Sequence, residues 1–387
     1  MSTAKKDAFL VLNAGSSSIK YAVYGTDLTL HLHGQVDRIG LGPAYHGGKN
    51  EIDLPVSPDA THAEVLDWLL NHIKGLSDEL RIVGAGHRVV HGGQDFAAPA
   101  RVTDAVMAKL EKLAPLAPAH QPHNLAGIRA VARRLADIPQ VACFDTAFHR
   151  TQPRIAQLFA IPRSFSDDGV LRYGFHGLSY HYISTQLTHH LDVPNGRVIV
   201  AHLGNGASMC AMQNMKSIAT TMGYTALDGL VMGRRCGELD PGVIFHMLRD
   251  RGMTVEEIET TLGSKSGLLG VSGISSDMRD LLASDSPAAV EAVDLFVYQA
   301  AKKIGALAAT LGGLDALVFT GGIGENAARI RARILQACAW LGADMDETAN
   351  FAGATRITTP NSRLAAHVIP TDEERIIAGE TRRLVTG

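Results

Sequence analysis

The sequence predicts a two-domain α/β protein. Two segments, residues 10–24 and 198–212, repeat one pattern in which a turn of small residues joins two apolar strands. Elsewhere, apolar segments typical of strands alternate with segments whose apolar residues recur at helical spacing. The chain has 387 residues, which is long enough for two hydrophobic cores. The repeated hairpin and the length together favour one hairpin in each domain.

The first half of the chain continues the alternation after its hairpin. A polar stretch rich in glycine and histidine leads to a helix around residues 63–75, and residues 81–93 predict a buried strand that runs into a loop. Residues 103–118 predict a helix that Thr103 caps and prolines end. Residues 124–149 predict another helix and then a strand that ends at Asp145. Such strand ends are where α/β sheets bind ligands.

The second half begins near Thr146 and has its own hairpin, a long helix over residues 287–311 and a glycine-rich turn at 319–329. The last twelve residues predict a helix that could pack on the first half. We therefore expect an N-terminal domain of residues 1–145 with 376–387, and a C-terminal domain of residues 146–375. Because no flexible Ser- or Gly-rich linker separates them, short hinges are expected to join the domains around one cleft.

Three turns of the sequence are suited to binding phosphate. Small polar residues interrupt both hairpins, and the turn at 319–329 follows an apolar run and opens a helix. Glycine lets the backbone approach an anion closely, hydroxyl and amide groups add donors, and a helix N-terminus favours negative charge. Any one of these turns could merely connect two elements, but three of them favour phosphate binding. The hairpin residues are Asn13, Gly15, Ser16 and Ser18 in the first and Gly204, Asn205, Gly206 and Ser208 in the second.

Composition and charge narrow the classes of function. The formal net charge is −3, so no general basic surface for nucleic acid is expected. The four cysteines form no CxxC pair, and no HExxH or GxxxxGK[ST] motif occurs, which argues against a zinc site and a P-loop. The apolar N-terminal segment is too short for a secretory signal, and no apolar run approaches the roughly 18 residues of a membrane span. We expect a cytoplasmic protein without a membrane or nucleic-acid partner.

Eight ordered motifs resemble those of the acetate kinase family, which belongs to the superfold of acetate and sugar kinases, heat-shock ATPases and actin. The resemblance runs from about Phe9 to Ile377, and it implies a ribonuclease H-like, two-domain α/β fold with a cleft between the domains. The family is typically dimeric, so a homodimer is expected, with the helix at 288–311 as a possible interface or equally a core helix. The motifs are VLNAGSSSIKY, FDTAFH, YGFHGLS, AHLGNGAS, MGRRCGELDPG, GVSGISSDMR, FTGGIGEN and PTDEE.

The resemblance also implies a reaction. The family transfers the γ-phosphoryl group of ATP reversibly and in line to a short carboxylic acid, giving an acyl phosphate and ADP. Such chemistry needs positioning and cations around the phosphoryl oxygens. A nucleotide switch of the same superfold is the alternative, but it predicts a peptide-binding domain or long insertions, which the sequence does not contain. Acetate is the first choice of acid, and propionate or another short-chain acid is the alternative.

Catalytic residues are carried over from the matching motifs. Arg88 and Arg235 match the two active-site arginines, whose guanidinium forks suit a carboxylate or a phosphoryl group. His176 matches the histidine that hydrogen-bonds the phosphoryl group in the transition state. The remaining matches are two supporting histidines, His120 and His202, and the active-site aspartate, Asp145.

The nucleotide and its metal are expected to use residues from both halves. Glu373 matches a magnesium-associated glutamate and Asn13 would assist it, with Mn²⁺ as a possible substitute for Mg²⁺. The run that contains Glu373 is also a good helix start. Met278 replaces the usual Phe beside the base, which leaves a polarizable contact but a weaker stacking face. The remaining nucleotide residues implied are Ser16, Ser18, Lys20, His202, Leu203, Gly204, Asn205, Gly206, Asp277, Arg279, Gly322, Ile323, Gly324 and Asn326.

The acyl pocket departs most from the family pattern. Ala119 stands where Leu is common, Ala226 where Pro is common, and Gln121 where Asn is common. The loss of several methylenes, each worth roughly 0.8 kcal/mol when buried, would make more room for a larger acid such as propionate. The expected acid-binding residues are Arg88, Val90, Ala119, Phe175, Ala226 and Arg235.

Overall fold

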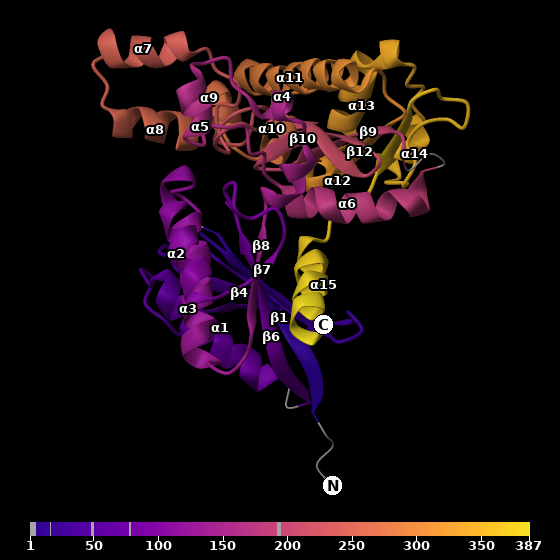
Figure 1. The fold of residues 1–387 in the computed structure, drawn as a ribbon. Helices are drawn as coiled ribbons and strands as arrows, with labels where there is room; N and C mark the ends of the chain where they lie inside the picture. The colour runs from indigo at the N-terminus through magenta and orange to yellow at the C-terminus, as the bar shows by residue number, and fades with distance from the viewer. Residues whose placement is uncertain (1–4, 16, 48–49, 77–78, 192–194) are drawn as a thin grey trace. The chain divides into compact units, whose positions relative to one another are not determined.

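The computed structural model describes residues 5–15, 17–47, 50–76, 79–191 and 195–387 (Figure 1). The chain forms two compact units. We call residues Met1–Phe148 with Asp372–Gly387 unit 1, and residues His149–Thr371 unit 2. Each unit contains one mixed β-sheet and the helices that cover it.

Unit 1 contains an eight-stranded sheet in the order β5-β4-β3-β2-β1-β6-β8-β7. Strands β1 and β2 form the first hairpin, while β1, β6 and β8 run parallel to one another. The carboxyl ends of these three strands therefore meet at one edge of the sheet. The elements are β1 (Lys6–Ala14), β2 (Ile19–Gly25), β3 (Leu30–Asp37), β4 (Ala44–Gly47), β5 (Asn50–Asp53), α1 (His62–Leu76), β6 (Leu80–Val89), β7 (Ala100–Arg101), α2 (Asp104–Lys112), α3 (Gln121–Arg134), β8 (Gln140–Phe144) and α15 (Glu373–Thr386).

Helices cover both faces of the central strands of unit 1. The C-terminal helix α15 packs on β6, β1 and β8, and α3 packs on the other face beside α1 (Figure 1). Gly86 in β6 permits this approach, because a Cβ there would collide with Ile377 and Thr381 of α15. The C-terminal helix thus completes the core of unit 1.

His87, next to Gly86 on the opposite face of β6, is almost fully buried and contacts the side-chain amide of Gln140 through Nε2 at 2.7 Å. The amide orientation that donates to His87 also satisfies Ile128 O and Ala132 N. Burial lowers the pKa of His87 from 6.5 to about 4, although the hydrogen bond to Gln140 opposes this shift. The ring is therefore a neutral member of the core.

This burial predicts an acid-sensitive fold. Between pH 6.5 and 4 the unfolded chain binds a proton at His87 and the folded chain does not, so the free energy of unfolding falls as pH falls. The loss from this group is on the order of 3 kcal/mol at most. Denaturant unfolding at several pH values gives the free energy of unfolding as a function of pH. This free energy should change less steeply with pH for His87→Gln than for wild type. If the pH dependence of the free energy of unfolding were the same in both proteins, His87 would be charged in the folded protein over this pH range.

Unit 2 contains a five-stranded sheet in the order β11-β10-β9-β12-β13. Strands β9 and β10 form the second hairpin, and β12 runs parallel to β9 and β13. The elements are α4 (Arg154–Gln157), α5 (Arg163–Asp167), α6 (Gly177–His190), β9 (Arg197–Leu203), β10 (Ala207–Gln213), β11 (Lys216–Thr220), α7 (Pro241–Arg249), α8 (Val255–Ser264), α9 (Gly267–Ser272), α10 (Met278–Ala283), α11 (Pro287–Leu311), β12 (Ala316–Thr320), α12 (Gly321–Asn326), α13 (Ala328–Ala337), α14 (Glu347–Phe351) and β13 (Ala365–Val368).

The long helix α11 has the bounds that the sequence predicted. Pro287 occupies its first turn, and Gly312 ends it in the left-handed conformation with φ of 69°. The helix packs on β9, β10 and β11 through its buried face. Val290 and Tyr298 on α11 remain exposed. The helix is therefore a core helix of unit 2, and its use in a dimer stays a prediction.

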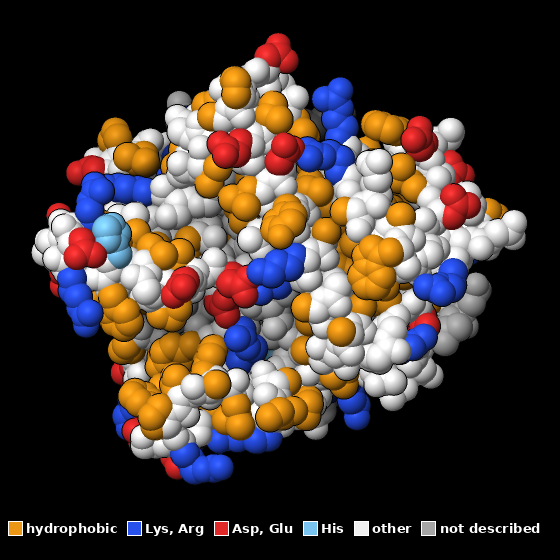
Figure 2. Space-filling view, turned by 90° about the horizontal axis from the view of Figure 1, so that it is seen from above, with side chains coloured by type: hydrophobic (Ala, Val, Ile, Leu, Met, Phe, Trp, Pro, Cys, Tyr) orange, Lys and Arg blue, Asp and Glu red, His pale blue; other side chains and the backbone are white. Residues whose placement is uncertain are grey.

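One sequence interpretation missed several strands. The stretch after the first hairpin was expected as a polar segment, but it contains β3, β4 and β5. These strands form one end of the sheet, with β5 as its edge strand, and most residues of β3 are exposed or half-buried. On the face drawn in Figure 2, side chains of both charges are mixed with apolar ones. Within the described ranges, no helix is both long and apolar enough to cross a membrane.

Candidate functional site

Unit 1 brings together three of the predicted residues at the carboxyl ends of its parallel strands. Arg88 of β6 donates from Nη2 to Asp145 Oδ2 at 2.7 Å, and its Nε lies 3.2 and 3.1 Å from the two carboxylate oxygens of Asp145. Its Nη1 donates to Asn13 Oδ1 at 3.2 Å. Asp145 is 1% exposed and Arg88 is 20% exposed. The buried aspartate thus fixes one side of the guanidinium, and the exposed part of the guanidinium can contact a ligand.

Carboxylates surround this arginine. Burial alone would lower the pKa of Arg88, but the charges of Asp145 and Glu373 outweigh it and raise that pKa above its usual range. Burial raises the pKa of Glu373 to about 7, Asp145 and Glu374 add to this rise, and Arg88 and Lys20 oppose it. Glu373 stands in the first turn of α15, after Asp372 has capped the helix by accepting from Arg375 N at 2.9 Å. The same acidic segment therefore caps the helix through Asp372 and places Glu373 beside the arginine.

The first hairpin turn is closed by the Gly15 N–H, which donates to Ser18 O at 2.8 Å. Lys20 pairs across the hairpin with Asn13, and its side chain is exposed. The structure therefore places Asn13, Ser18 and Lys20 in one hairpin. The remaining predicted residue of this turn, Ser16, lies outside the described residues.

The predicted acid-binding residues of unit 1 differ in exposure. Val90 follows β6 and is buried, whereas Ala119 is exposed in the segment before α3. His120 occupies the N-cap position of α3 and is partly exposed. Within the described part of the chain, no group of three or more His, Cys, Asp or Glu residues is arranged to hold a metal ion.

Unit 2 brings His176 and His202 together. Their rings stack with centroids 4.4 Å apart. His176 Nδ1 lies 2.8 Å from Ser208 Oγ, and His202 Nδ1 lies 2.9 Å from Ser179 Oγ. His176 has a left-handed backbone conformation with φ of 59°, which is costly for a residue with a side chain. Each ring thus has a hydroxyl at Nδ1, which orients the Nε2 edge away from that contact.

Arg235 and His176 converge on the second hairpin turn. A Cβ added at Gly206 would lie 2.6 Å from Arg235 Nη2 and 3.3 Å from His176 Nε2. Only glycine therefore allows both side chains to approach the turn this closely. Arg235 Nη1 donates to Ala226 O at 2.8 Å. The contact that Ala226 makes with this arginine is therefore through its backbone.

In the third turn, one N–H group at the start of the helix is already engaged, and anion binding by this turn stays a prediction. Helix α12 has only six residues, and the Gly321 N–H donates to the carboxylate of Glu325 at 2.8 Å. The same oxygen, Glu325 Oε1, accepts from Thr371 N at 3.2 Å. The first N–H of the helix is thus used by a side chain of the helix itself. Gly322 and Asn326 are exposed, Ile323 is partly exposed and Gly324 is buried.

The segment expected beside the base separates into a surface pair and a buried residue. Asp277 caps α10, and Arg279 pairs with it through Nη2 at 2.6 Å. Arg279 is 90% exposed, whereas Met278 is 3% exposed. The described geometry thus leaves Arg279, rather than Met278, as the accessible side chain of this segment.

Phe175, expected in the acyl pocket, is buried, and its carbonyl accepts from His149 Nε2 at 2.9 Å.

The second hairpin turn is also shaped by close backbone approach. The Gly204 N–H donates to Gly206 O at 3.1 Å, and the Gly233 N–H donates to Asn205 O at 2.9 Å. Thr320 of β12 pairs with His202 of β9, which brings the start of α12 beside the turn that follows Leu203. The nucleotide residues predicted from the second hairpin and from α12 therefore lie at one edge of this sheet.

Sequence reasoning missed the residue that supports α12. Arg331 of α13 is 1% exposed and donates to the carbonyl oxygens of Gly324 at 2.9 Å and Glu325 at 2.8 Å. It also donates from Nε to Asn350 Oδ1 at 2.9 Å. An arginine in an amphipathic helix usually faces solvent, so nothing in the local pattern distinguished this one. Only its partners, up to 19 positions away, give it a role.

Comparison with known proteins identifies the family of the chain. The family model of the acetokinase family matches residues 8–379. The chain belongs to the acetokinase family. An acetate kinase from Rhodopseudomonas palustris is 52% identical over 394 residues, which cover 98% of this chain and 99% of that protein. The family assignment and the phosphotransferase class predicted from the eight motifs are thereby confirmed.

Solved structures of related proteins share the fold. The crystal structure of a propionate kinase from Francisella tularensis has a TM-score of 0.90 and 38% identity, covering 97% of this chain and 99% of that one. The crystal structure of Porphyromonas gingivalis acetate kinase has a TM-score of 0.87 and 36% identity, covering 98% of this chain and all of that one. These similarities confirm the α/β fold predicted for the family.

Proposed function

We propose that this chain transfers the γ-phosphoryl group of ATP reversibly to acetate, giving acetyl phosphate and ADP. The observation that carries the proposal is the full-length identity of 52% to an acetate kinase, together with the Asn13–Arg88–Asp145 cluster at the strand ends of unit 1. In-line phosphoryl transfer is governed by positioning and charge stabilisation, and the cluster supplies both.

The guanidinium of Arg88 is assigned to the oxygens of the carboxylate or of the transferring phosphoryl group. Its pairing with buried Asp145 holds the fork in one orientation, which lowers the entropic cost of binding an anion. Arg235 is assigned the same electrostatic task beside Gly206. His176 donates a hydrogen bond from Nε2 to the phosphoryl group in the transition state, with His120 and His202 as supporting donors.

Magnesium is assigned to Glu373 with help from Asn13. Both offer oxygen atoms, which Mg²⁺ prefers. Burial raises the pKa of Glu373 although the charge of Arg88 opposes the rise, so a bound cation would stabilise the charged form of this carboxylate. When bound, the ion would neutralise charge on the nucleotide phosphates, and Mn²⁺ could replace it. Asn13, Ser18 and Lys20 in unit 1 and the turn at 204–206 in unit 2 are assigned to the phosphates. The domain roles, a cytoplasmic location and a homodimer belong to the same proposal.

A second candidate acid is propionate. Ala119 and Ala226 replace bulkier residues at the expected pocket, and a relative with a TM-score of 0.90 is described as a propionate kinase. One methylene in an apolar pocket changes kcat/KM by about 10- to 200-fold. The choice between acetate and propionate is therefore measurable.

An acid series tests the proposal. Formate, acetate, propionate and butyrate are each supplied with ATP and Mg²⁺, and hydroxylamine traps the acyl phosphate as a hydroxamate. We expect acetate to give the highest kcat/KM, because the full-length relatives at about half identity are acetate kinases. A higher kcat/KM for propionate would replace acetate by the second candidate. Absence of hydroxamate with every acid would overturn the acyl kinase assignment.

A further inference from the structure

Two buried amide side chains at the start of α3 tie together separate segments of unit 1. Asn124 accepts from Val90 N at 2.9 Å and donates to Ala14 O at 2.6 Å. Gln121 accepts from His91 N at 3.1 Å and donates to His91 O at 3.1 Å and to Leu110 O at 3.3 Å. Their exposed fractions are 3% and 0%. We call these two residues the amide clamp.

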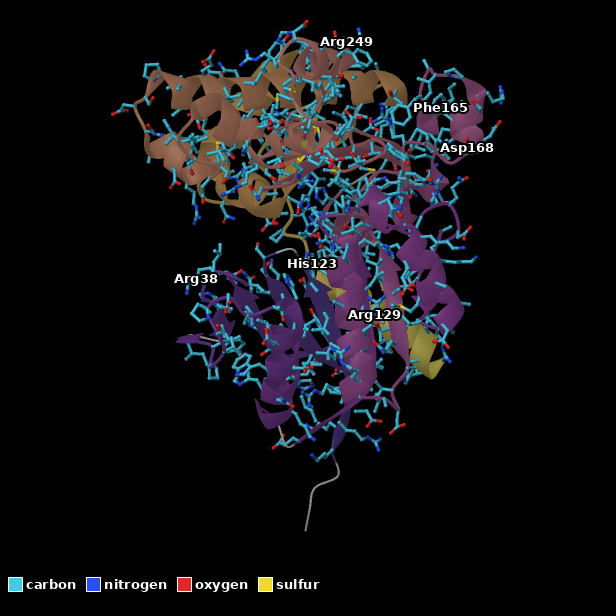
Figure 3. The ribbon with its side chains drawn as sticks, turned by 90° about the vertical axis from the view of Figure 1, so that its left-hand side faces the viewer. Arg38, His123, Arg129, Phe165, Asp168 and Arg249 are labelled. Atoms are coloured by element: carbon cyan, nitrogen blue, oxygen red, sulfur yellow. The ribbon has the colours of Figure 1, made fainter. Side chains whose placement is uncertain are left out.

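The clamp contacts the two segments of unit 1 to which substrates are assigned. Ala14 ends β1 and begins the first hairpin turn, and Val90 and His91 begin the loop that follows β6, the strand of Arg88. Helix α3 begins at Gln121, so the clamp lies at its N-terminal end, near His123, whereas Arg129 marks a later turn of the helix (Figure 3). Ala119, assigned to the acyl wall, lies two residues before the clamp.

Hydrogen bonding by the clamp depends on side-chain length. Both the acceptor and the donor of each amide are engaged, which is the condition for burying such a group at low cost. Gln121 meets the N–H and the carbonyl of His91 together, so its length fixes the separation between the loop and the start of α3. Asparagine, which is common at this position in the family, is one methylene shorter and would require a different separation between the loop and the start of α3.

We propose that Gln121 and Asn124 are positioning residues with separate tasks: Gln121 sets the acyl wall, and Asn124 holds the phosphate hairpin in register with it. The inference rests on the proposed function, since that function assigns Val90 and Ala119 to the acid and the first hairpin to ATP. The side chain of Gln121 bonds the backbone of His91, which directly follows Val90 of the acyl wall, and the carbonyl of Leu110, so it acts on the acid. Asn124 accepts from Val90 N and donates to Ala14 O, so it links the acyl wall to the hairpin, and its donor toward Ala14 is the part that acts on the nucleotide.

Two isosteric or nearly isosteric variants separate these tasks. Gln121→Asn shortens the first amide, whereas Asn124→Asp keeps the acceptor for Val90 N and replaces the donor to Ala14 O by an oxygen. Gln94→Asn is the matched control, because Gln94 is exposed in the same unit. For each purified full-length variant, kcat and KM are measured for acetate, propionate and ATP, and thermal unfolding is recorded.

For Gln121→Asn we expect the ratio of kcat/KM for acetate to that for propionate to change about tenfold, the low end for one methylene, with KM for ATP near wild type. For Asn124→Asp we expect KM for ATP to rise about tenfold with the acid ratio unchanged, since the interaction lost supports nucleotide binding. Should Gln121→Asn not fold, Gln121→Glu replaces it, because it keeps the acceptor toward His91 N.

A different pattern would overturn the inference. If both variants unfold at lower temperature but keep the wild-type KM values and acid ratio, the clamp is a structural feature only. If both variants affect acid and ATP equally, the tasks are not separate. Failure of the proposed function is distinguishable, because wild type and Gln94→Asn would then form no acyl phosphate from any acid.

Discussion

Alanine at position 88 or at position 235 is expected to lower kcat for acetyl phosphate formation by roughly 10³-fold or more, the effect of removing an arginine that stabilises a phosphoryl transition state. Arg88 holds its fork between Asp145 and Asn13, so its positive charge is already oriented before substrate binds. Arg235 lies against the Gly206 turn, where a Cβ would collide with it. Steady-state rates with ATP and acetate measure both losses.

The Arg88 variant needs a control for stability. Alanine leaves the buried carboxylate of Asp145 without its partner, and breaking such a pair costs about 3–5 kcal/mol. Arg88→Lys keeps a positive charge but cannot bind Asp145 and Asn13 as a fork, so it should fold and still lose most activity. Arg81 is on the same strand as Arg88 and forms an exposed pair with Asp7 of β1, so Arg81→Ala should change neither rate nor stability appreciably. Near-normal kcat in Arg88→Ala and Arg235→Ala would show that the site is wrongly assigned.

Replacing His176 by alanine is expected to slow the chemical step by about 10²- to 10³-fold while nucleotide affinity stays within a few fold. A single preorganised donor to transition-state charge has this value. The ring is preorganised by stacking on His202 and by the contact of Nδ1 with Ser208. Rapid-mixing measurements of phosphoryl transfer give the first quantity, and equilibrium titration with ADP gives the second.

Backbone strain must be separated from chemistry at this position. His176 has φ of 59°, a conformation that asparagine tolerates better than alanine does, so His176→Asn keeps the local structure with less cost. His246→Ala serves as the matched control, because His246 of α7 is exposed and pairs with Asp250, the residue that follows the helix. A loss confined to nucleotide affinity in both His176 variants would contradict the role assigned to this histidine.

The central strands and the long helices could be predicted because their signals are local. Thr103 accepts from Val106 N as an N-cap should, and proline and glycine mark the two ends of α11. Strands β3 to β5 could not be recognised in the same way. They form one end of the sheet, and β3 is mostly exposed or half-buried, so its composition resembles that of a loop.

The sequence by itself determined the family and named the candidate positions for chemistry, because glycine turns and the order of the motifs are properties of the chain alone. The tertiary structure decided which polar groups are used internally. Glu325 occupies the Gly321 N–H, Arg331 supports α12, and Asn124 reaches Ala14 across 110 positions. These partners are distant in sequence, and a hydrogen bond forms only where packing brings a donor within about 3 Å of an acceptor. The local sequence pattern therefore identifies candidate hydrogen-bonding groups, whereas packing decides which of them are used within the protein and which can bind a ligand.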